Sequence, residues 1–119
     1  MPTVAVIGAS KERGKYGNRA VRAYVRQGWT VYPVNPNESE VEGLATFPRI
    51  ADIPGPVDRA TLYVPPDVGR RLLAEIKAKG VGELFVNPGA ESDELMAEAE
   101  RLGLEPILAC SIVDIGEQP

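Results

Sequence analysis

The sequence contains no histidine and a single cysteine, Cys110. Without histidine, the chain cannot use histidine-based acid–base catalysis, phosphohistidine chemistry, Ser-His or Cys-His nucleophile pairs, or the usual zinc sites. One cysteine cannot form an internal disulfide or a multi-cysteine metal site. The sequence therefore predicts neither a catalytic residue nor a bound metal ion.

Long apolar runs are also lacking. No stretch approaches the roughly 20 consecutive apolar residues of a membrane span, and the first residues lead directly into a predicted strand without a signal peptide. We therefore expect a cytoplasmic protein with no membrane partner. With 119 residues, 44% of them hydrophobic and 25% charged, the chain is expected to form one globular domain over residues 1–119.

The charge is unevenly distributed. Residues 1–36 contain six Lys or Arg and one acid, a local charge of +5, whereas residues 37–119 contain seven bases and sixteen acids, a charge of −9. A small anion would be attracted to the first segment, but a long polyanion would be repelled elsewhere, as expected from a net charge of −4. These charges favour a small-molecule ligand and argue against nucleic acid.

Apolar runs alternate with helical patterns along the chain. Because the predicted strands are apolar on both faces and separated by helices, we expect an α/β, Rossmann-like three-layer fold. Its five-stranded parallel sheet would have helices on both faces, the strand order 3-2-1-4-5 and a ligand crevice at the carboxyl ends of strands one and four. The predicted strands are 3–7, 30–34, 59–64, 83–86 and 106–109; the predicted helices are 18–27, 66–79 and 93–102, with a helical turn at 49–53 and a loosely held tail at 111–119.

The loop between the first strand and the first helix is the most informative segment. Gly8 allows a tight turn there, and a helix starting near Gly17 directs unpaired backbone N–H groups and the positive end of its dipole into the loop. Lys11, Arg13 and Lys15 add three cations within five residues. This pattern predicts a site for more than one phosphate, although an ordinary βα turn with a solvated basic loop is the alternative interpretation.

The spacing of the glycines does not match a dinucleotide fingerprint. Gly8, Gly14 and Gly17 read G-x5-G-x2-G, whereas the fingerprint is G-x-G-x2-G followed by an acid at the end of the second strand. Here that strand ends at Asn35-Pro36-Asn37, without a carboxylate. The sequence therefore argues against NAD. NADP stays open, although no Arg or Lys is close in sequence to that strand end.

Prolines lie at the carboxyl ends of two of the predicted strands, in Pro33-Val34-Asn35-Pro36 and Tyr63-Val64-Pro65-Pro66. Proline stiffens a loop and removes a backbone donor, so these loops are suited to be walls. Two such walls beside a phosphate loop predict a slot for a flat group such as adenine.

With these segments in place, the chain resembles the small CoA-binding domain family, the Rossmann-like module that also forms the N-terminal domain of the succinyl-CoA synthetase α subunit. The resemblance covers nearly the whole chain and implies coenzyme A or an acyl-CoA as the ligand. It also implies that the first loop holds the CoA phosphates and that the loops after the second and third strands enclose the adenosine. The matching stretches are Val6 to Ser10, Tyr16-Gly17-Asn18, Pro33 to Pro36, Phe47-Pro48 to Ile53-Pro54, Tyr63 to Pro66, and Cys110.

The expected CoA-binding residues are those of the loops just described. They are Gly8, Ala9, Ser10, Lys11, Arg13, Tyr16, Gly17, Asn18, Pro33, Val34, Asn35, Pro36, Tyr63, Val64, Pro65, Asn87 and Gly89. The chain departs from the family where Asn37 replaces a frequent lysine, where Asn87-Pro88-Gly89 replaces a Gln before a Gly, and where Leu108-Ala109 replaces a charged pair.

Three function classes follow from these observations. The leading one is a module that binds CoA or an acyl-CoA without catalysis. The alternatives are an enzyme that uses NADP or another nucleotide, and a regulatory or scaffold domain that has lost its ligand. A protein partner or a homo-oligomer is compatible with all three. Cys110 fits either the core or a mixed disulfide with a CoA thiol.

Overall fold

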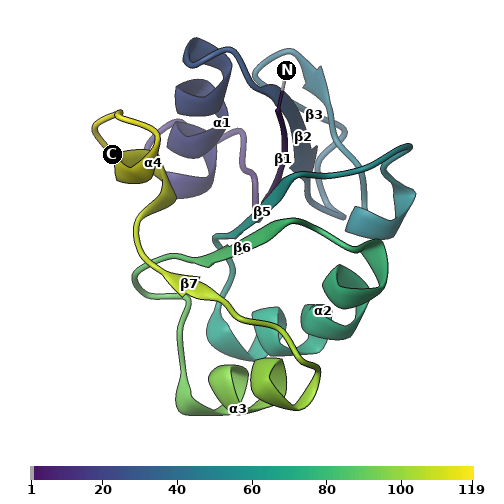
Figure 1. Cartoon of the computed structure of the whole chain (residues 1–119). Helices are drawn as coiled ribbons and strands as arrows, with labels where there is room; N and C mark the ends of the chain where they lie inside the picture. The colour runs from purple at the N-terminus through teal and green to yellow at the C-terminus, as the bar shows by residue number, and fades with distance from the viewer. Residues whose placement is uncertain (1) are drawn as a thin grey trace.

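The computed structural model describes residues 2–119. A parallel sheet of five strands, in the order β2-β1-β5-β6-β7, forms the middle of the molecule, and β3 and β4 form a separate antiparallel hairpin (Figure 1). Along the chain the elements are β1 (Thr3–Ile7), α1 (Tyr16–Arg26), β2 (Thr30–Val34), β3 (Glu40–Val41), β4 (Leu44–Ala45), the 3₁₀ turn η1 (Ile50–Asp52), β5 (Arg59–Leu62), α2 (Pro66–Lys79), β6 (Glu83–Val86), α3 (Asp93–Arg101), β7 (Ile107–Leu108) and α4 (Ser111–Asp114).

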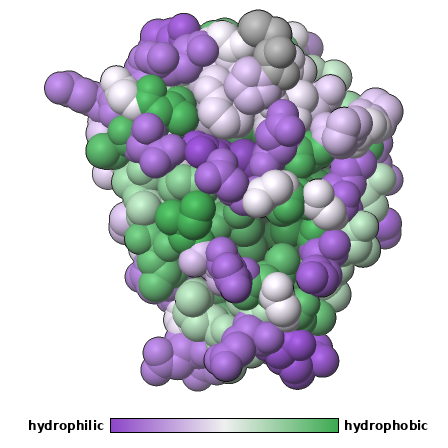
Figure 2. Space-filling model, in the orientation of Figure 1, coloured by the Kyte–Doolittle hydropathy of each residue, from purple (hydrophilic) through white to green (hydrophobic). Residues whose placement is uncertain are grey.

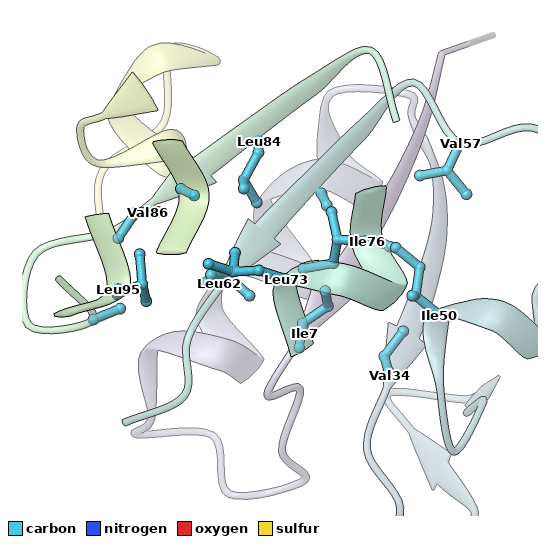
Figure 3. Close-up of a cluster of buried hydrophobic side chains, with 14 of the residues drawn as sticks. Ile7, Val34, Ile50, Val57, Leu62, Leu73, Ile76, Leu84, Val86 and Leu95 are labelled. Atoms are coloured by element: carbon cyan, nitrogen blue, oxygen red, sulfur yellow. The ribbon is translucent and has the colours of Figure 1, made fainter. Parts of the chain in front are cut away.

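Helices cover both faces of the sheet, which confirms the predicted α/β three-layer class. On one face, Val4 and Val6 of β1 belong to a buried cluster with residues of α1 and α4. On the other face, Ala5 and Ile7 belong to a second cluster with residues of α2, α3 and η1 (Figure 3). The central strand β1 is therefore buried on both sides, as its continuous apolar sequence indicates.

The predicted strand order is wrong. Counted along the main sheet, the observed order is 2-1-3-4-5, because β5 pairs with β1, for example Ala60 with Ala5, rather than lying outside β2. The outer side of β2 is occupied by the segment that follows it, which carries the β3-β4 hairpin and makes a parallel bridge between Val34 and Phe47. Pro33 suits this edge position because proline has no N–H for a second strand partner.

The corrected order moves the crevice. From β1 the chain first adds β2 on one side and then adds β5, β6 and β7 in turn on the other side. The point at which the direction of the strand order reverses, the topological switch point, therefore lies between β1 and β5. Ligands of open α/β sheets bind outside the carboxyl ends of the strands at such a point. The loops after β1 and β5 therefore frame the candidate site, in place of the expected loops of strands one and four.

Local signals fixed most helix boundaries. Helix α2 spans the predicted residues, starting at Pro66 and ending before Gly80, which has the left-handed φ of 78°. Ser92 caps α3, and its Oγ accepts a hydrogen bond from Leu95 N at 3.0 Å. Helix α1 starts at Tyr16, two residues earlier than expected, and β5 ends at Leu62 rather than residue 64.

The C-terminal segment is not the loose tail that we expected. Ser111 and Ile112 in α4 are fully buried, and Ile112 packs into the cluster beneath α1. Glu117 then accepts hydrogen bonds from Arg26 and Gln27 at 2.9 and 2.6 Å. These contacts hold the end of the chain against α1.

Strand β7 forms the second edge of the main sheet. Leu108 of this strand is 56% exposed, and Figure 2 shows hydrophobic surface in the middle of the face on which β7 lies.

Within residues 2–119, no helix combines the length and the apolar character that a membrane crossing requires.

Candidate functional site

Two glycines allow the loop after β1 to touch its neighbours through backbone atoms. Gly8 has a φ of +94°, and a Cβ there would lie 2.6 Å from the carbonyl oxygen of Tyr63. A Cβ on Gly17 would lie only 2.1 Å from the carbonyl oxygen of Gly8. The start of α1, the loop after β1 and the loop after β5 are therefore packed against each other so closely that both positions require glycine.

The first turn of α1 has free donor capacity. Lys15, its N-cap residue, makes no side-chain cap hydrogen bond, and no acidic residue lies in this turn. Helix α3 differs, because Ser92 caps it and Asp93 and Glu94 occupy its first turn. The start of α1 therefore presents backbone N–H groups and the positive end of the helix dipole toward the loop, an arrangement that favours an anion.

Asn18 and Arg22 hold residues 8–18 in shape; we call this segment the phosphate loop after the ligand group that the sequence predicts for it. The fully buried Asn18 donates from Nδ2 to the Ser10 carbonyl oxygen at 2.8 Å and accepts from Arg22 Nε at 2.8 Å. Arg22 Nη2 in turn donates to the Arg13 carbonyl oxygen at 2.8 Å. Sequence reasoning did not place Arg22 in the site, although its spacing of four residues from Asn18 puts both on one face of α1.

The three cations of the phosphate loop each have a carboxylate partner. All three side chains nevertheless remain largely exposed to solvent, at 65–70% of their surface. Lys11 Nζ lies 3.9 Å from Glu38 Oε1, Arg13 Nη2 lies 3.4 Å from Glu42 Oε1, and Lys15 Nζ lies 3.2 Å from Glu12 Oε2.

A cavity of about 400 Å³ lies on one side of the phosphate loop. Asn35 connects the loop after β2 to the loop after β1. Its Nδ2 donates to the Ala9 carbonyl oxygen at 2.7 Å, and its Oδ1 accepts from Asn37 N at 2.8 Å. The lining comprises Ile7, Gly8, Val34, Asn35, Pro36, Asn37, Pro48, Arg49, Ile50, Val64, Val68, Leu72, Glu75 and Ile76. Because it is the smaller of the two spaces beside the phosphate loop, we call it the smaller cavity.

Arg49 corrects the expectation that no cation lies near the end of β2. It lines the smaller cavity together with Asn35, and its Nε lies 3.4 Å from Glu75 Oε1. The sequence did not reveal Arg49 because it lies far along the chain from the end of β2, and only the fold brings η1 back to that strand.

Pro33 was expected in the site but does not contribute to it. It is buried within β2 opposite Val6 and lines neither this cavity nor the groove described next.

A larger groove, of about 980 Å³, lies on the other side of the loop after β5. Val64 lines both it and the smaller cavity, so the two spaces lie next to each other with this residue as a common wall. The groove is mostly apolar, and it includes the half-buried Cys110. Its lining comprises Gly14, Lys15, Tyr16, Gly17, Leu62, Tyr63, Val64, Pro65, Pro66, Asn87, Pro88, Gly89, Ala90, Cys110, Val113 and Pro119.

A buried hydrogen-bond network joins Asn87 and Tyr63, which line the groove, to Thr61 and Ser111 behind them. Asn87 Nδ2 donates to Thr61 Oγ1 at 2.7 Å and to the Leu62 carbonyl oxygen at 2.8 Å, and its Oδ1 accepts from Ser111 N at 2.9 Å. The Ser111 hydroxyl lies 2.8 Å from Thr61 Oγ1 and 3.2 Å from the Tyr63 hydroxyl. This network fixes the loops after β5 and β6 and the start of α4 relative to one another.

Burial raises the pKa of Tyr63 to about 12, against the opposing effect of its hydrogen bonds to Ser111 and Thr61. Its phenol is therefore neutral at physiological pH and serves as a wall with one polar end. Thr61 and Ser111, which support the groove without lining it, were not among the expected residues. Thr61 lies inside β5, and only the fold brings Ser111 to it.

A third cavity, of about 330 Å³, lies at the opposite, amino-terminal edge of the sheet. It is lined by residues 80–84 and 103–105, together with Ile76, Lys77 and Ile107. None of the expected site residues lines it. The expected residues other than Pro33 instead belong to the phosphate loop or to the two spaces beside it.

Comparisons with known proteins assign the chain to a family. The family model for the CoA binding domain matches residues 2–115. The chain is 41% identical over 107 residues to an ADP-forming acetate–CoA ligase II of Archaeoglobus fulgidus, and 35% identical over 115 residues to the α subunit of such a ligase from Pyrococcus furiosus. The chain therefore belongs to the CoA-binding domain family.

The extent of these matches differs. The aligned part is 87% of this chain in both cases, but only 16% of the Archaeoglobus ligase and 25% of the Pyrococcus subunit. The solved structure of a conserved hypothetical protein from Pyrococcus furiosus is 36% identical in sequence and superposes with a TM-score of 0.87, covering 96% of this chain and 99% of that chain. The chain thus corresponds to one domain of the ligases and to nearly all of that smaller relative.

Proposed function

We propose that this chain binds coenzyme A or an acyl-CoA and catalyses no reaction by itself. The observation that carries the proposal is the meeting of three features at one point: the uncapped start of α1, the cations of the phosphate loop, and two cavities that share Val64. A ligand with phosphates in its middle and a less polar group at each end matches that arrangement. Membership of the CoA-binding domain family supports the same ligand.

The residues present fit the parts of CoA. Gly8 to Asn18 would hold the phosphates, through backbone N–H groups and the side chains of Lys11 and Arg13. Asn35, Pro36 and Val64 would enclose the adenosine in the smaller cavity. The groove past Tyr63, Pro65, Asn87 and Gly89 would take the pantetheine arm, whose thiol supplies the acyl-carrying chemistry when CoA is bound.

The proposal that the chain is not an enzyme rests on its side chains and on its relatives. The chain has no histidine, and it corresponds to a quarter or less of the length of the two ligase chains compared above. The ionisable side chains that line the groove are Lys15, Cys110 and two tyrosines, of which Tyr63 is held neutral.

One observation favours a second candidate, an NADP-dependent enzyme. Arg49 is a cation at the smaller cavity, and a cation there suits a phosphate on the ribose, whether the 3′-phosphate of CoA or the 2′-phosphate of NADP. Mass spectrometry of small molecules released from the purified protein separates the two. A pantetheine-containing species supports CoA binding, whereas a nicotinamide dinucleotide supports the enzyme.

Calorimetry tests the proposal directly. We expect CoA to bind with a dissociation constant in the micromolar range and dephospho-CoA to bind about three- to tenfold more weakly, because each phosphate lost removes a charge-assisted contact. Acetyl-CoA should be recovered unhydrolysed after the titration. Equal affinities for CoA and dephospho-CoA would show that the basic residues do not recognise the third phosphate, and hydrolysis that co-purifies with the protein would contradict a purely binding role.

A further inference from the structure

Two carboxylates of the β3-β4 region occupy donors of the phosphate loop. Glu38 Oε2 accepts a hydrogen bond from the backbone N–H of Lys11 at 3.2 Å, and its Oε1 lies near Lys11 Nζ. Glu42 Oε2 accepts from Asn18 Nδ2 at 3.1 Å, while its Oε1 pairs with Arg13. A carboxylate that accepts from a loop amide and pairs with a loop cation makes the same types of contact that a phosphate would make.

The backbone of Glu42 adopts a strained conformation, which is consistent with a role in contacting the loop. It is the only residue other than glycine with a positive φ, 51°, within residues 2–119. Glutamate in this left-handed conformation is less stable than glycine or asparagine, which are the common residues of tight hairpin turns. The contacts of the Glu42 side chain with Asn18 and Arg13 offset part of this strain, and such strain often marks a functional position.

We infer that Glu38 and Glu42 are built-in competitors of the ligand's phosphates. The inference rests on the proposed function: in the free protein the two carboxylates neutralise the phosphate loop, and an incoming polyphosphate must displace them. Their side chains are 17% and 25% exposed, so they are largely enclosed beside the loop. The affinity of the wild-type site is therefore set below what its cations and backbone donors alone would give.

A third acid in the same segment, Glu40, allows the specific contacts of Glu38 and Glu42 to be distinguished from a general effect of negative charge. Glu40 lies between Glu38 and Glu42 on the same hairpin, and its exposed side chain makes no ion pair or hydrogen bond with the residues that the structure describes. Glu40→Gln therefore changes the net charge by the same amount as Glu42→Gln without touching the loop. It is a matched control.

The test is calorimetry of Glu38→Gln, Glu42→Gln and Glu40→Gln with CoA, together with NMR titration of the same proteins with inorganic pyrophosphate. We expect each loop-contacting variant to bind both ligands about three- to tenfold more tightly than wild type, the effect of removing one partly enclosed ion pair, and Glu40→Gln to match wild type. Glu42→Asn gives a second neutral variant in case the glutamine strains the turn, because asparagine accepts left-handed backbone.

Each outcome decides between the two proposals. Unchanged or weaker binding in the Glu38 and Glu42 variants, or an equal gain in Glu40→Gln, would overturn the competitor inference while leaving CoA binding intact. If no protein binds CoA but the variants gain affinity for pyrophosphate, the competitor inference stands and the proposed ligand is wrong. If neither ligand binds to any of them, both proposals fail.

Discussion

Replacing Gly17 by alanine is expected to destabilise the fold by about 3 kcal/mol or more. The added Cβ would lie 2.1 Å from the carbonyl oxygen of Gly8, and neither the Cβ nor this oxygen can move without a shift of the backbone. Relief would require α1 to move away from β1, although Ala20, Val21 and Tyr24 of α1 are fully buried against the sheet. Urea denaturation followed by circular dichroism measures the change in the free energy of unfolding.

Gly14→Ala provides the matched control on the same loop. No atom lies within 4 Å of a Cβ built at Gly14, and its backbone does not need a positive φ. Its stability should remain within about 0.5 kcal/mol of wild type. A Gly17→Ala protein as stable as Gly14→Ala would mean that the close approach of α1 to the phosphate loop does not exist in solution.

Replacing Asn87 by aspartate should also be strongly destabilising at neutral pH, by about 3 kcal/mol or more. The Asn87 Nδ2 group donates to the Thr61 hydroxyl and to the Leu62 carbonyl oxygen in a buried site. A carboxylate oxygen in its place would face the carbonyl oxygen without a proton to share. The substitution changes almost no volume, so the loss isolates the hydrogen bonds from the packing.

The effect of Asn87→Asp should depend on pH. Burial and the facing carbonyl raise the pKa of the new carboxyl above its unfolded value of about 3.9. The folded state then binds the proton more tightly, so destabilisation is smallest below about pH 4 and grows as pH rises to the folded pKa. Asn37→Asp, at an exposed position, should change stability by no more than about 0.5 kcal/mol at either pH. A pH-independent effect would contradict the buried network.

The α/β class and much of the site could be predicted from the sequence because their signals are local. Pro66 and Gly80 mark the ends of α2, and Gly8 with Gly17 marked the tight junction between β1 and α1. Strand order lacked such a signal, since alternating strands and helices permit several orders. Pro33 was the available clue: a proline within the second strand favours an edge position, which the observed order gives to β2 and the expected order did not.

The partners of the predicted residues could not be found from the sequence. Glu38 reaches Lys11 across 27 positions, and Ser111 reaches Thr61 across 50, so both contacts depend on the completed fold. The final residues were misjudged for the same reason. A helix of four residues such as α4 leaves only a weak signal in the sequence, and only the burial of Ile112 beneath α1 shows that this segment belongs to the core.

The most direct test of CoA binding at this site is an NMR titration that follows backbone amide signals as CoA is added. The largest shifts should fall in residues 8–18, in Asn35 and Asn37, and in Tyr63 and Val64, around the phosphate loop and the two spaces beside it. Residues 80–84 and 103–105, which line the cavity at the opposite edge of the sheet, should shift little and serve as the internal control. Shifts centred on that opposite cavity, or none at millimolar CoA, would contradict the account.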